Sequence, residues 1–360
     1  MYHWLQRLFS GPAPAADPQQ ESGPATAPAP AAPAEAAAAA GVSFEQLDRV
    51  NGAYFDWLFD SGGAAGLDTN PREKQVLDAL RAIIDSQQSG AALVRRLPGL
   101  IPQLLQSLRS DNFSGAQLSR TISGDVVLVA AVIRLANSSF KGSGTTITSV
   151  EHAVMLIGQE GLRHLITSVA FRPIIDMNSG HYTRSLAPRI WDQSERCAVA
   201  NRALAEQLGI APFEAFLAGL VQHVGMIVAL RVMDQVAKGG KELGSEMFCA
   251  RLTRDARILT CNIGAEWSFP ESVTLAISEQ SGMKKGSAIS ALGRLMILSG
   301  YLSKVRILVE QGRLPENDPT LFAGLAPLAA QCYRALEPIG DEASAPPAMP
   351  AARPPPPPMP

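Results

Sequence analysis

Two polar side chains interrupt one of the most apolar stretches of the chain. Gln222 and His223 lie between Pro212 and Met233, where most other residues are apolar. A buried amide or imidazole without a hydrogen-bond partner costs roughly 1–3 kcal/mol. Two interpretations therefore stay open: the two side chains belong to a satisfied hydrogen-bond network in the core, or they line a pocket.

A second polar cluster consists of Arg134, Asn137 and Ser138, at the end of the apolar segment 126–136. Asn and Ser at such a position commonly bond to backbone groups that the helix end leaves free. The alternative is a recognition groove, in which the guanidinium of Arg134 binds a phosphate-bearing ligand through two hydrogen bonds. These three residues are the candidate ligand-binding or partner-binding residues.

The chain carries none of the common catalytic or metal-binding motifs. Its four cysteines form no CxxC pair and match no zinc spacing. A Walker loop and a GxSxG nucleophile elbow are also absent from the sequence. We therefore expect no cofactor and no metal, and free thiols that pack as small hydrophobes in a cytoplasmic protein.

Helix signals dominate the elements that must position these residues. Ser43 with Gln46 predicts a capping box, as does Asn70 with Glu73, and Pro71 suits a first helical turn. Sustained alternation and Asn-Gly hairpins, which favour strands, are absent from the sequence. The expected fold class is all-α.

Further along the chain, three signals mark element boundaries. Thr148 with Glu151 predicts another capping box. The segment 178–189 contains helix breakers and polar residues, and we expect it to connect two lobes. Pro212 is expected to open a helix that continues through Met233.

Composition divides the chain into five parts. Ala and Pro dominate two segments that cannot bury enough apolar surface to order themselves. The expected parts are a short amphipathic segment (1–10), a disordered linker (11–40), an N-terminal helical extension (41–92), a two-lobed main domain (93–338, with lobes at 93–180 and 188–338) and a disordered Pro-rich tail (341–360).

Charge and hydropathy exclude some classes of partner. Only 18% of the residues are charged and the formal net charge is −2, so no basic surface for nucleic acid is expected. No apolar run reaches the ~18–20 residues of a membrane span, so no transmembrane segment is expected. Weak membrane contact or peptide docking through residues 1–10 is the remaining membrane hypothesis.

Three stretches of sequence, in order, resemble the HDOD (HD-related output domain) family. The first comprises LPGLIPQLLQSLR, ISGDVVLVAAVIRLANSSFKG and ITSVEHAVMLIGQEGLRHLI. The second comprises IWDQSERCAVANRALAEQLG and FLAGLVQHVGMIVAL, and the third is NIGAEWSFPESVTLAISEQ. Together they span about residues 93–335. The resemblance implies a two-lobed all-α domain related to HD-type metal-dependent phosphohydrolases.

The resemblance also indicates where a catalytic site would lie. In active HD phosphohydrolases a His-Asp dyad and outlying histidines hold a divalent metal that activates water. The matching positions here are Gln222 and His223 for the dyad, Gln193 upstream, and Glu279 and Gln280 downstream. One imidazole and one carboxylate among neutral amides make a poor metal cage. The resemblance therefore implies a vestigial pocket and no enzyme activity.

The expected function is a non-catalytic bacterial signal-transduction module that binds protein partners. The resemblance associates such modules with cyclic-di-GMP, motility or virulence regulation. Two alternatives stay open: a receptor for a nucleotide second messenger in the vestigial pocket, and a residual metal-dependent phosphohydrolase. It also stays open whether residues 42–90 act as a lid over a groove or extend the core.

Overall fold

The computed structural model describes residues 41–61, 66–86, 100–109, 129–130, 132–133, 136–137, 147–172, 179–237, 243–281 and 288–336. Within these ranges all regular structure is helical, which confirms the predicted all-α class. The predicted segments 1–10, 11–40 and 341–360 lie outside the described residues. The helices are α3 (Phe44–Phe59), α4 (Pro71–Asp85), α5 (Leu100–Arg109), α8 (Val150–Phe171), α9 (His181–Ala205), α10 (Pro212–Val221), α11 (Val224–Val236), α12 (Glu246–Glu266), α13 (Glu271–Glu279), α14 (Ala291–Glu310) and α15 (Pro327–Ala335), with short 3₁₀ turns η2 (Glu206–Leu208) and η3 (Pro319–Leu321).

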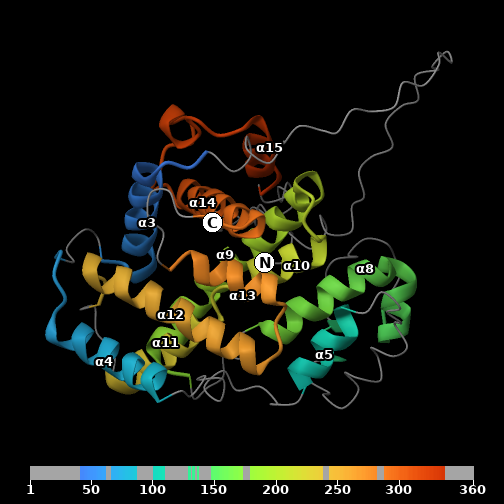
Figure 1. Ribbon diagram of the computed structural model, residues 1–360, viewed down its shortest axis with the longest axis horizontal. Helices are drawn as coiled ribbons and strands as arrows, with labels where there is room; N and C mark the ends of the chain where they lie inside the picture. Colours follow the sequence, from blue (N-terminus) through green and yellow to red (C-terminus); the bar gives the residue numbers. More distant parts are fainter. Residues whose placement is uncertain are drawn as a thin grey trace, which may run out of the picture.

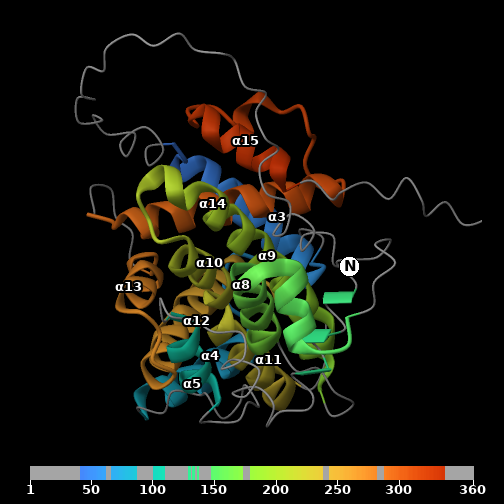
Figure 2. The same ribbon diagram turned by 90° about the vertical axis from the view of Figure 1, so that its right-hand side faces the viewer.

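Helix α9 lies at the centre of the molecule. It packs against α10, α11 and α14, and more lightly against α3 and α15 (Figure 1). Helices α14 and α15 lie at one end of the molecule, and α4 and α11 lie at the other (Figure 2). Large side chains such as Phe216, Phe248 and Tyr301 fill the core between these layers. A well-filled core of this kind fixes the relative positions of the helices that carry the site.

The N-terminal extension packs on the main body through both of its helices. The predicted capping box of Ser43 and Gln46 is present at the start of α3. Gln46 also donates from Nε2 to the carbonyl of Thr320 (2.8 Å), and Arg49 pairs with Asp318 (2.7 Å). These bonds attach α3 to η3, and α3 also packs on α9 and α14.

The second helix of the extension is held by one buried carboxylate. Glu73 completes the predicted capping box with Asn70 at the start of α4. The same carboxylate accepts hydrogen bonds from the backbone amides of Gly244 and Ser245 (2.8 Å each) and from the Ser245 hydroxyl (2.6 Å). Glu73 therefore ties α4 to the start of α12, and the extension is part of the packed core.

Two predicted boundaries are wrong. The N-cap of α8 is Ser149, whose hydroxyl accepts from the His152 amide (3.1 Å), and not Thr148. The segment 178–189 is helical from His181 onward, because α9 runs through Pro188. Proline in a helix interior removes one backbone hydrogen bond, and packing against the neighbouring helices offsets that loss. The predicted division of the main domain near residue 188 therefore falls inside a helix.

The start of α9 depends on a residue far away in the sequence. The Asp234 carboxylate, on α11, accepts from the backbone amides of Tyr182 (2.8 Å) and Thr183 (3.3 Å). Gly180 precedes the helix, and a Cβ atom there would overlap the Asp234 side chain. Long-range capping of this kind replaces the local signals by which a helix start is recognised in sequence.

Within the described residues, one segment is long and apolar enough to span a membrane by composition alone. It covers Pro212–Val236, and 94% of its most apolar window is buried inside the structure. An apolar helix that is covered on nearly all sides by other helices is typical of a protein core.

Candidate functional site

The predicted continuous helix from Pro212 to Met233 is interrupted at the two polar residues. Helix α10 ends at Val221 and α11 begins at Val224, so Gln222 and His223 form a turn between them. The hydroxyl of Thr260, on α12, accepts from the Gly225 amide (3.0 Å) and lies 3.3 Å from the Gln222 carbonyl. This side chain binds backbone groups that the interruption frees, which the apolar pattern of the segment does not reveal.

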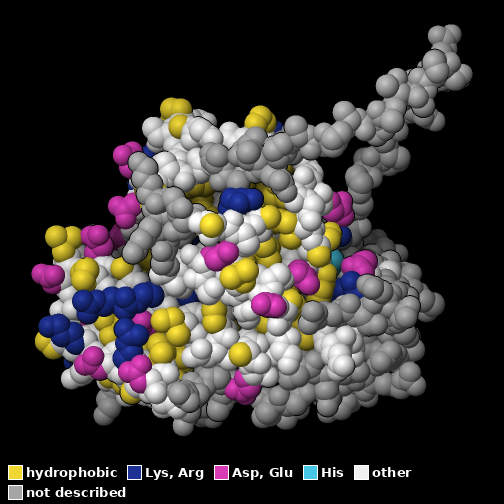
Figure 3. Space-filling model, in the orientation of Figure 1, with side chains coloured by type: hydrophobic (Ala, Val, Ile, Leu, Met, Phe, Trp, Pro, Cys, Tyr) yellow, Lys and Arg dark blue, Asp and Glu magenta, His cyan; other side chains and the backbone are white. Residues whose placement is uncertain are grey.

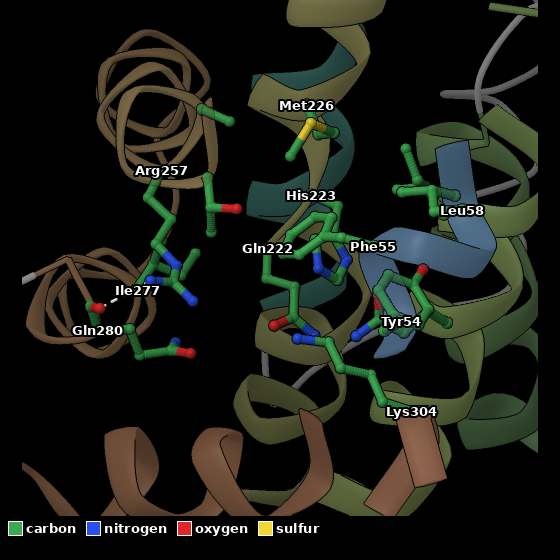
Figure 4. Close-up of a pocket in the computed structure, with 14 residues that line it drawn as sticks. Tyr54, Phe55, Leu58, Gln222, His223, Met226, Arg257, Ile277, Gln280 and Lys304 are labelled. Atoms are coloured by element: carbon green, nitrogen blue, oxygen red, sulfur yellow. Dashed lines mark hydrogen bonds between the residues drawn. The ribbon is translucent and has the colours of Figure 1, made fainter. Parts of the chain in front are cut away.

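The interruption places Gln222 and His223 in the wall of a pocket. Gln193 of α9 and Gln280, which follows α13, line the same pocket (Figure 4). Four of the five predicted family positions are therefore brought together. The cavity volume is about 40 Å³. The other lining residues come from α3, α9, α11, α12, α13 and α14: Tyr54, Phe55, Leu58, Ile190, Met226, Thr253, Ala256, Arg257, Ile277 and Lys304.

The fifth predicted position, Glu279, does not line this pocket. Its carboxylate accepts from the backbone amide of Ser290 (3.0 Å) and from the Ser290 hydroxyl (2.7 Å). Ser290 is the N-cap of α14, so Glu279 holds the start of that helix. A negative charge near a helix N-terminus is favourable, which accounts for this carboxylate structurally.

His223 is hydrogen-bonded and also lines the pocket. Its Nδ1 lies 2.9 Å from the Ser194 hydroxyl. Burial, together with the charges of Lys304 and Arg257, lowers the imidazole pKa to about 3. The ring is therefore neutral at physiological pH. The two interpretations of this position, core network and pocket wall, apply together.

The amides of the pocket wall also use part of their hydrogen-bonding capacity within the fold. Gln222 donates from Nε2 to the Gly219 carbonyl (3.0 Å). Gln280 donates from Nε2 to the Ala276 carbonyl (3.1 Å). Each bond holds the amide against its own helix, so the wall is organised by local contacts.

Two cationic side chains that were not predicted from the sequence also line the pocket. Lys304 of α14 donates to the Asn51 side-chain oxygen (2.6 Å), and Arg257 of α12 donates from Nη1 to the Gln280 carbonyl (2.7 Å). Burial lowers the pKa of Lys304 to about 8 and that of Arg257 to about 10, and the charge of Arg257 adds to the effect on Lys304. Lys304 shares a helical face with the buried Tyr301 and Leu308, and that spacing is a signal that could have identified it.

The N-terminal extension forms one side of the pocket. Tyr54, Phe55 and Leu58, all on α3, face the side chains from the main body in Figure 4. The ammonium group of Lys304 lies 5.3 Å from the centre of the Tyr54 ring. Cations are attracted to the faces of aromatic rings at such distances. Helix α3 thus covers the pocket while remaining part of the core.

The donor set does not fit the divalent metal that HD phosphohydrolases hold. The pocket offers one imidazole, three side-chain amides and two cationic groups. Amide oxygens are weak ligands for transition metals, and the two cations repel a positive ion. Among the described residues, no group of three or more His, Cys, Asp or Glu side chains is placed to hold a metal.

Of the second predicted cluster, only Asn137 lies within the described residues. The Asn137 amide donates to the carbonyls of Ile133 (3.0 Å) and Ile147 (2.6 Å), and its oxygen accepts from the Ile147 amide (2.7 Å). These bonds are the backbone capping that the sequence left open as one interpretation. Arg134 and Ser138 lie outside the described residues.

Most of the cysteines, and His164, are buried in the core. The four cysteines are free, and three of them are buried: Cys197, Cys249 and Cys332. His164 is 1% exposed and packs edge-on against the Phe216 ring, with 4.5 Å between centroids. Burial lowers its pKa to about 3, so it packs in the core as a neutral ring.

Comparisons with known proteins give relatives of low sequence identity. A protein of Treponema pallidum (strain Nichols), described only as uncharacterized, is 23% identical over 137 residues, which is 38% of this chain and 26% of that protein. The chain thus spans about a quarter of the length of this curated relative.

Solved structures with related helical arrangements are also distant in sequence. A "Putative phosphohydrolase" from Shewanella amazonensis SB2B is 21% identical and covers 72% of this chain and 96% of its own, with a TM-score of 0.49. An HDOD domain protein of unknown function from Geobacter sulfurreducens is 17% identical and covers 73% and 89%, with a TM-score of 0.49. The MmoQ response regulator from Methylococcus capsulatus is 21% identical and covers 68% and 93%, with a TM-score of 0.34.

A family model also matches the chain. The model of the HDOD domain matches residues 94–283, which is more than half of the chain. The matched range contains Gln193, Gln222, His223 and Gln280 of the pocket, whereas α3 and Lys304 lie outside it. The chain belongs to the HDOD domain family.

Proposed function

We propose that the chain is a non-catalytic signal-transduction module that acts by binding protein partners. The observation that carries the proposal is the composition of the pocket at the family positions. Gln193, Gln222, His223 and Gln280 converge there, and two cations accompany them in place of carboxylates. Metal-dependent phosphoester hydrolysis needs anionic or imidazole ligands that converge on an ion, and this set does not provide them.

Membership of the HDOD family supports a regulatory role. A regulatory domain without chemistry of its own acts through what it binds, and a protein partner in a bacterial signalling pathway is the form of action we favour. The proposal includes a cytoplasmic location and a recognition surface near Arg134.

A nucleotide second messenger is a weaker candidate for the pocket. The cations favour a phosphate group, but the cavity of about 40 Å³ is small and α3 covers one side of it. Pockets for drug-sized ligands are typically about 300–1,000 Å³. A whole nucleotide therefore requires α3 to move.

The partner-binding proposal is tested with the full-length chain in extracts of its native host. Proteins retained by the wild-type chain are identified by mass spectrometry, purified, and titrated against the wild type and two variants. Arg134→Ala is expected to weaken binding about tenfold, because arginine side chains often dominate interfaces. Arg251→Ala, which removes an exposed arginine of α12, is the matched control and is expected to bind normally.

Two outcomes contradict the proposal. One is that no retained protein binds the purified chain directly and saturably. The other is that the chain, with metal supplied, turns over a phosphoester, which would make it an enzyme. Circular dichroism of each variant distinguishes lost binding from lost folding.

A further inference from the structure

The pocket holds two cationic side chains without an acidic partner. Lys304 and Arg257 reach into the same space from α14 and α12 (Figure 4). Their hydrogen bonds go to neutral oxygens, the side chain of Asn51 and the carbonyl of Gln280. Among the described residues that line the pocket, none carries a carboxylate.

Two partly buried arginines nearby, Arg196 and Arg306, are paired with carboxylates. Arg196 binds both oxygens of Glu310 (2.9 Å each) and also Asp192 (3.1 Å). Arg306 binds the same Glu310 (2.7 Å). A buried cation is unfavourable unless an anion compensates it, and α9 and α14 provide such an anion at these sites. The pocket cations differ from these two arginines, because no carboxylate among the described residues binds them.

Burial without a compensating anion lowers the pKa of both cations. Burial lowers the pKa of Lys304 to about 8, and Arg257 adds repulsion. The neutral His223 ring and the Tyr54 hydroxyl also face this space, and neither supplies a negative charge at neutral pH. An anion between the two cations would relieve their repulsion and form charge-assisted hydrogen bonds.

The size of the cavity limits what that anion can be. The cavity volume of about 40 Å³ is well below the roughly 300–1,000 Å³ of typical pockets for drug-sized ligands. A compact group with a few oxygens matches this space. Tyr54, Phe55 and Leu58 of α3 line one side of this space.

We propose that this pocket binds a small oxyanion of the phosphate type, held between Lys304 and Arg257 beneath α3. The guanidinium donates hydrogen bonds from its fork, and the ammonium group contributes a compact charge. The charge of the site is opposite to that of a divalent-metal site, which needs anionic ligands. The inference is independent of the partner-binding function, since an anion can bind whether or not a protein does.

The oxyanion is either free in solution or the terminal phosphate of a small phosphorylated molecule. Titration calorimetry and thermal unfolding of the full-length chain distinguish the two. The arms are inorganic phosphate, sulfate, a nucleoside monophosphate and a cyclic dinucleotide, each against sodium chloride at matched ionic strength. We expect phosphate to raise the melting temperature in a saturable way, because a ligand that binds only the folded state stabilises it.

The variants Lys304→Gln and Arg257→Gln remove one charge each. Both are expected to bind phosphate at least about tenfold more weakly, because each loses charge-assisted hydrogen bonds. Arg254→Gln, an exposed arginine of the same helix α12, is the control and is expected to bind as the wild type does. Without phosphate, Lys304→Gln is expected to be at least as stable as the wild type, which separates lost binding from misfolding.

Three results overturn the inference. Stabilisation by phosphate that chloride matches at equal ionic strength indicates general screening. Equal weakening in Arg254→Gln and in the pocket variants indicates non-specific attraction. Tighter binding of the cyclic dinucleotide, which has no terminal phosphate, than of inorganic phosphate indicates a larger ligand and a displaced α3. Saturable phosphate binding that only the two pocket variants lose supports it.

Discussion

At the residue scale, the fold strongly raises the pKa of the Glu195 carboxyl group. It is 7% exposed on α9, and its Oε1 accepts a hydrogen bond from the Trp191 indole (2.6 Å). Burial raises its pKa from 4.5 to about 8, and the nearby charge of Arg172 opposes only part of that increase. The folded chain therefore keeps this carboxyl protonated where the unfolded chain ionises it.

This difference gives a pH dependence of stability with a definite sign. Between pH 4.5 and about 8 the folded state binds more protons at Glu195 than the unfolded state does. Its contribution to stability is therefore full below the lower value and is lost as pH rises through the upper one. Glu195→Gln keeps the oxygen that accepts from Trp191 and cannot ionise. We expect the variant to gain stability over the wild type progressively as pH rises through this window.

Urea unfolding at a series of pH values measures the effect. Glu206→Gln, at an exposed position just beyond α9, is the control and should show no such trend. A constant difference in unfolding free energy between Glu195→Gln and the wild type across the window would contradict a raised pKa of Glu195 in the folded state.

Single residues also show what the sequence could and could not predict about the site. Gln222 and His223 were identifiable, because polar side chains in an apolar run are conspicuous. Arg257 was not, because nothing local distinguishes it from the exposed Arg251 and Arg254 on the same helix. Its role depends on how α12 packs against α11 and α13, which is a property of the tertiary structure.

At the element scale, the boundaries set by local contacts were predictable and those set by distant contacts were not. The caps of α3 and α4 lie within a few residues of the helices that they start. The start of α9 depends on Asp234, and the interruption before α11 depends on Thr260. Neither contact can be predicted from the spacing of nearby residues in the sequence.

Helix α4 provides a test of such long-range capping. Glu73 is fully buried and accepts from the backbone amides of Asn70, Gly244 and Ser245. Glu73→Gln replaces one acceptor oxygen with an amide group that faces donors. We expect the free energy of unfolding to fall by about 2–4 kcal/mol, because buried donors lose a charged partner.

The matched control is Glu246→Gln, at an exposed position in the first turn of α12. Removing a charge there is expected to change the unfolding free energy by less than about 1 kcal/mol, because only the helix dipole is affected. Equal effects of the two substitutions in urea unfolding would refute the dual capping role of Glu73.

At the scale of the whole molecule, charge is distributed unevenly over the surface. Figure 3 shows lysine and arginine side chains gathered over the region of α4 and α12. Exposed residues of these helices include Lys74, Arg81, Arg251 and Arg254, and the buried Asp255 pairs with Arg81 and Arg254. The net charge of the chain is nevertheless −2, so the absence of nucleic-acid binding remains a prediction.

The pocket combines the family domain with the flanking parts of the chain. The family match ends at residue 283, yet α3 covers the pocket and Lys304 enters it from α14. The sequence resemblance could therefore locate the amide side of the site. It could not reveal the cationic side, because the residues that form it lie outside the matched segments or carry no motif.

We do not expect the pocket to support metal-dependent hydrolysis. The most direct test measures metal content and phosphodiester turnover of the full-length chain after incubation with manganese, iron or magnesium. We expect no stoichiometric metal and no turnover above that of His223→Ala, because none of the described residues that line the pocket is anionic and two are cationic. Stoichiometric metal together with turnover that His223→Ala abolishes would contradict this expectation.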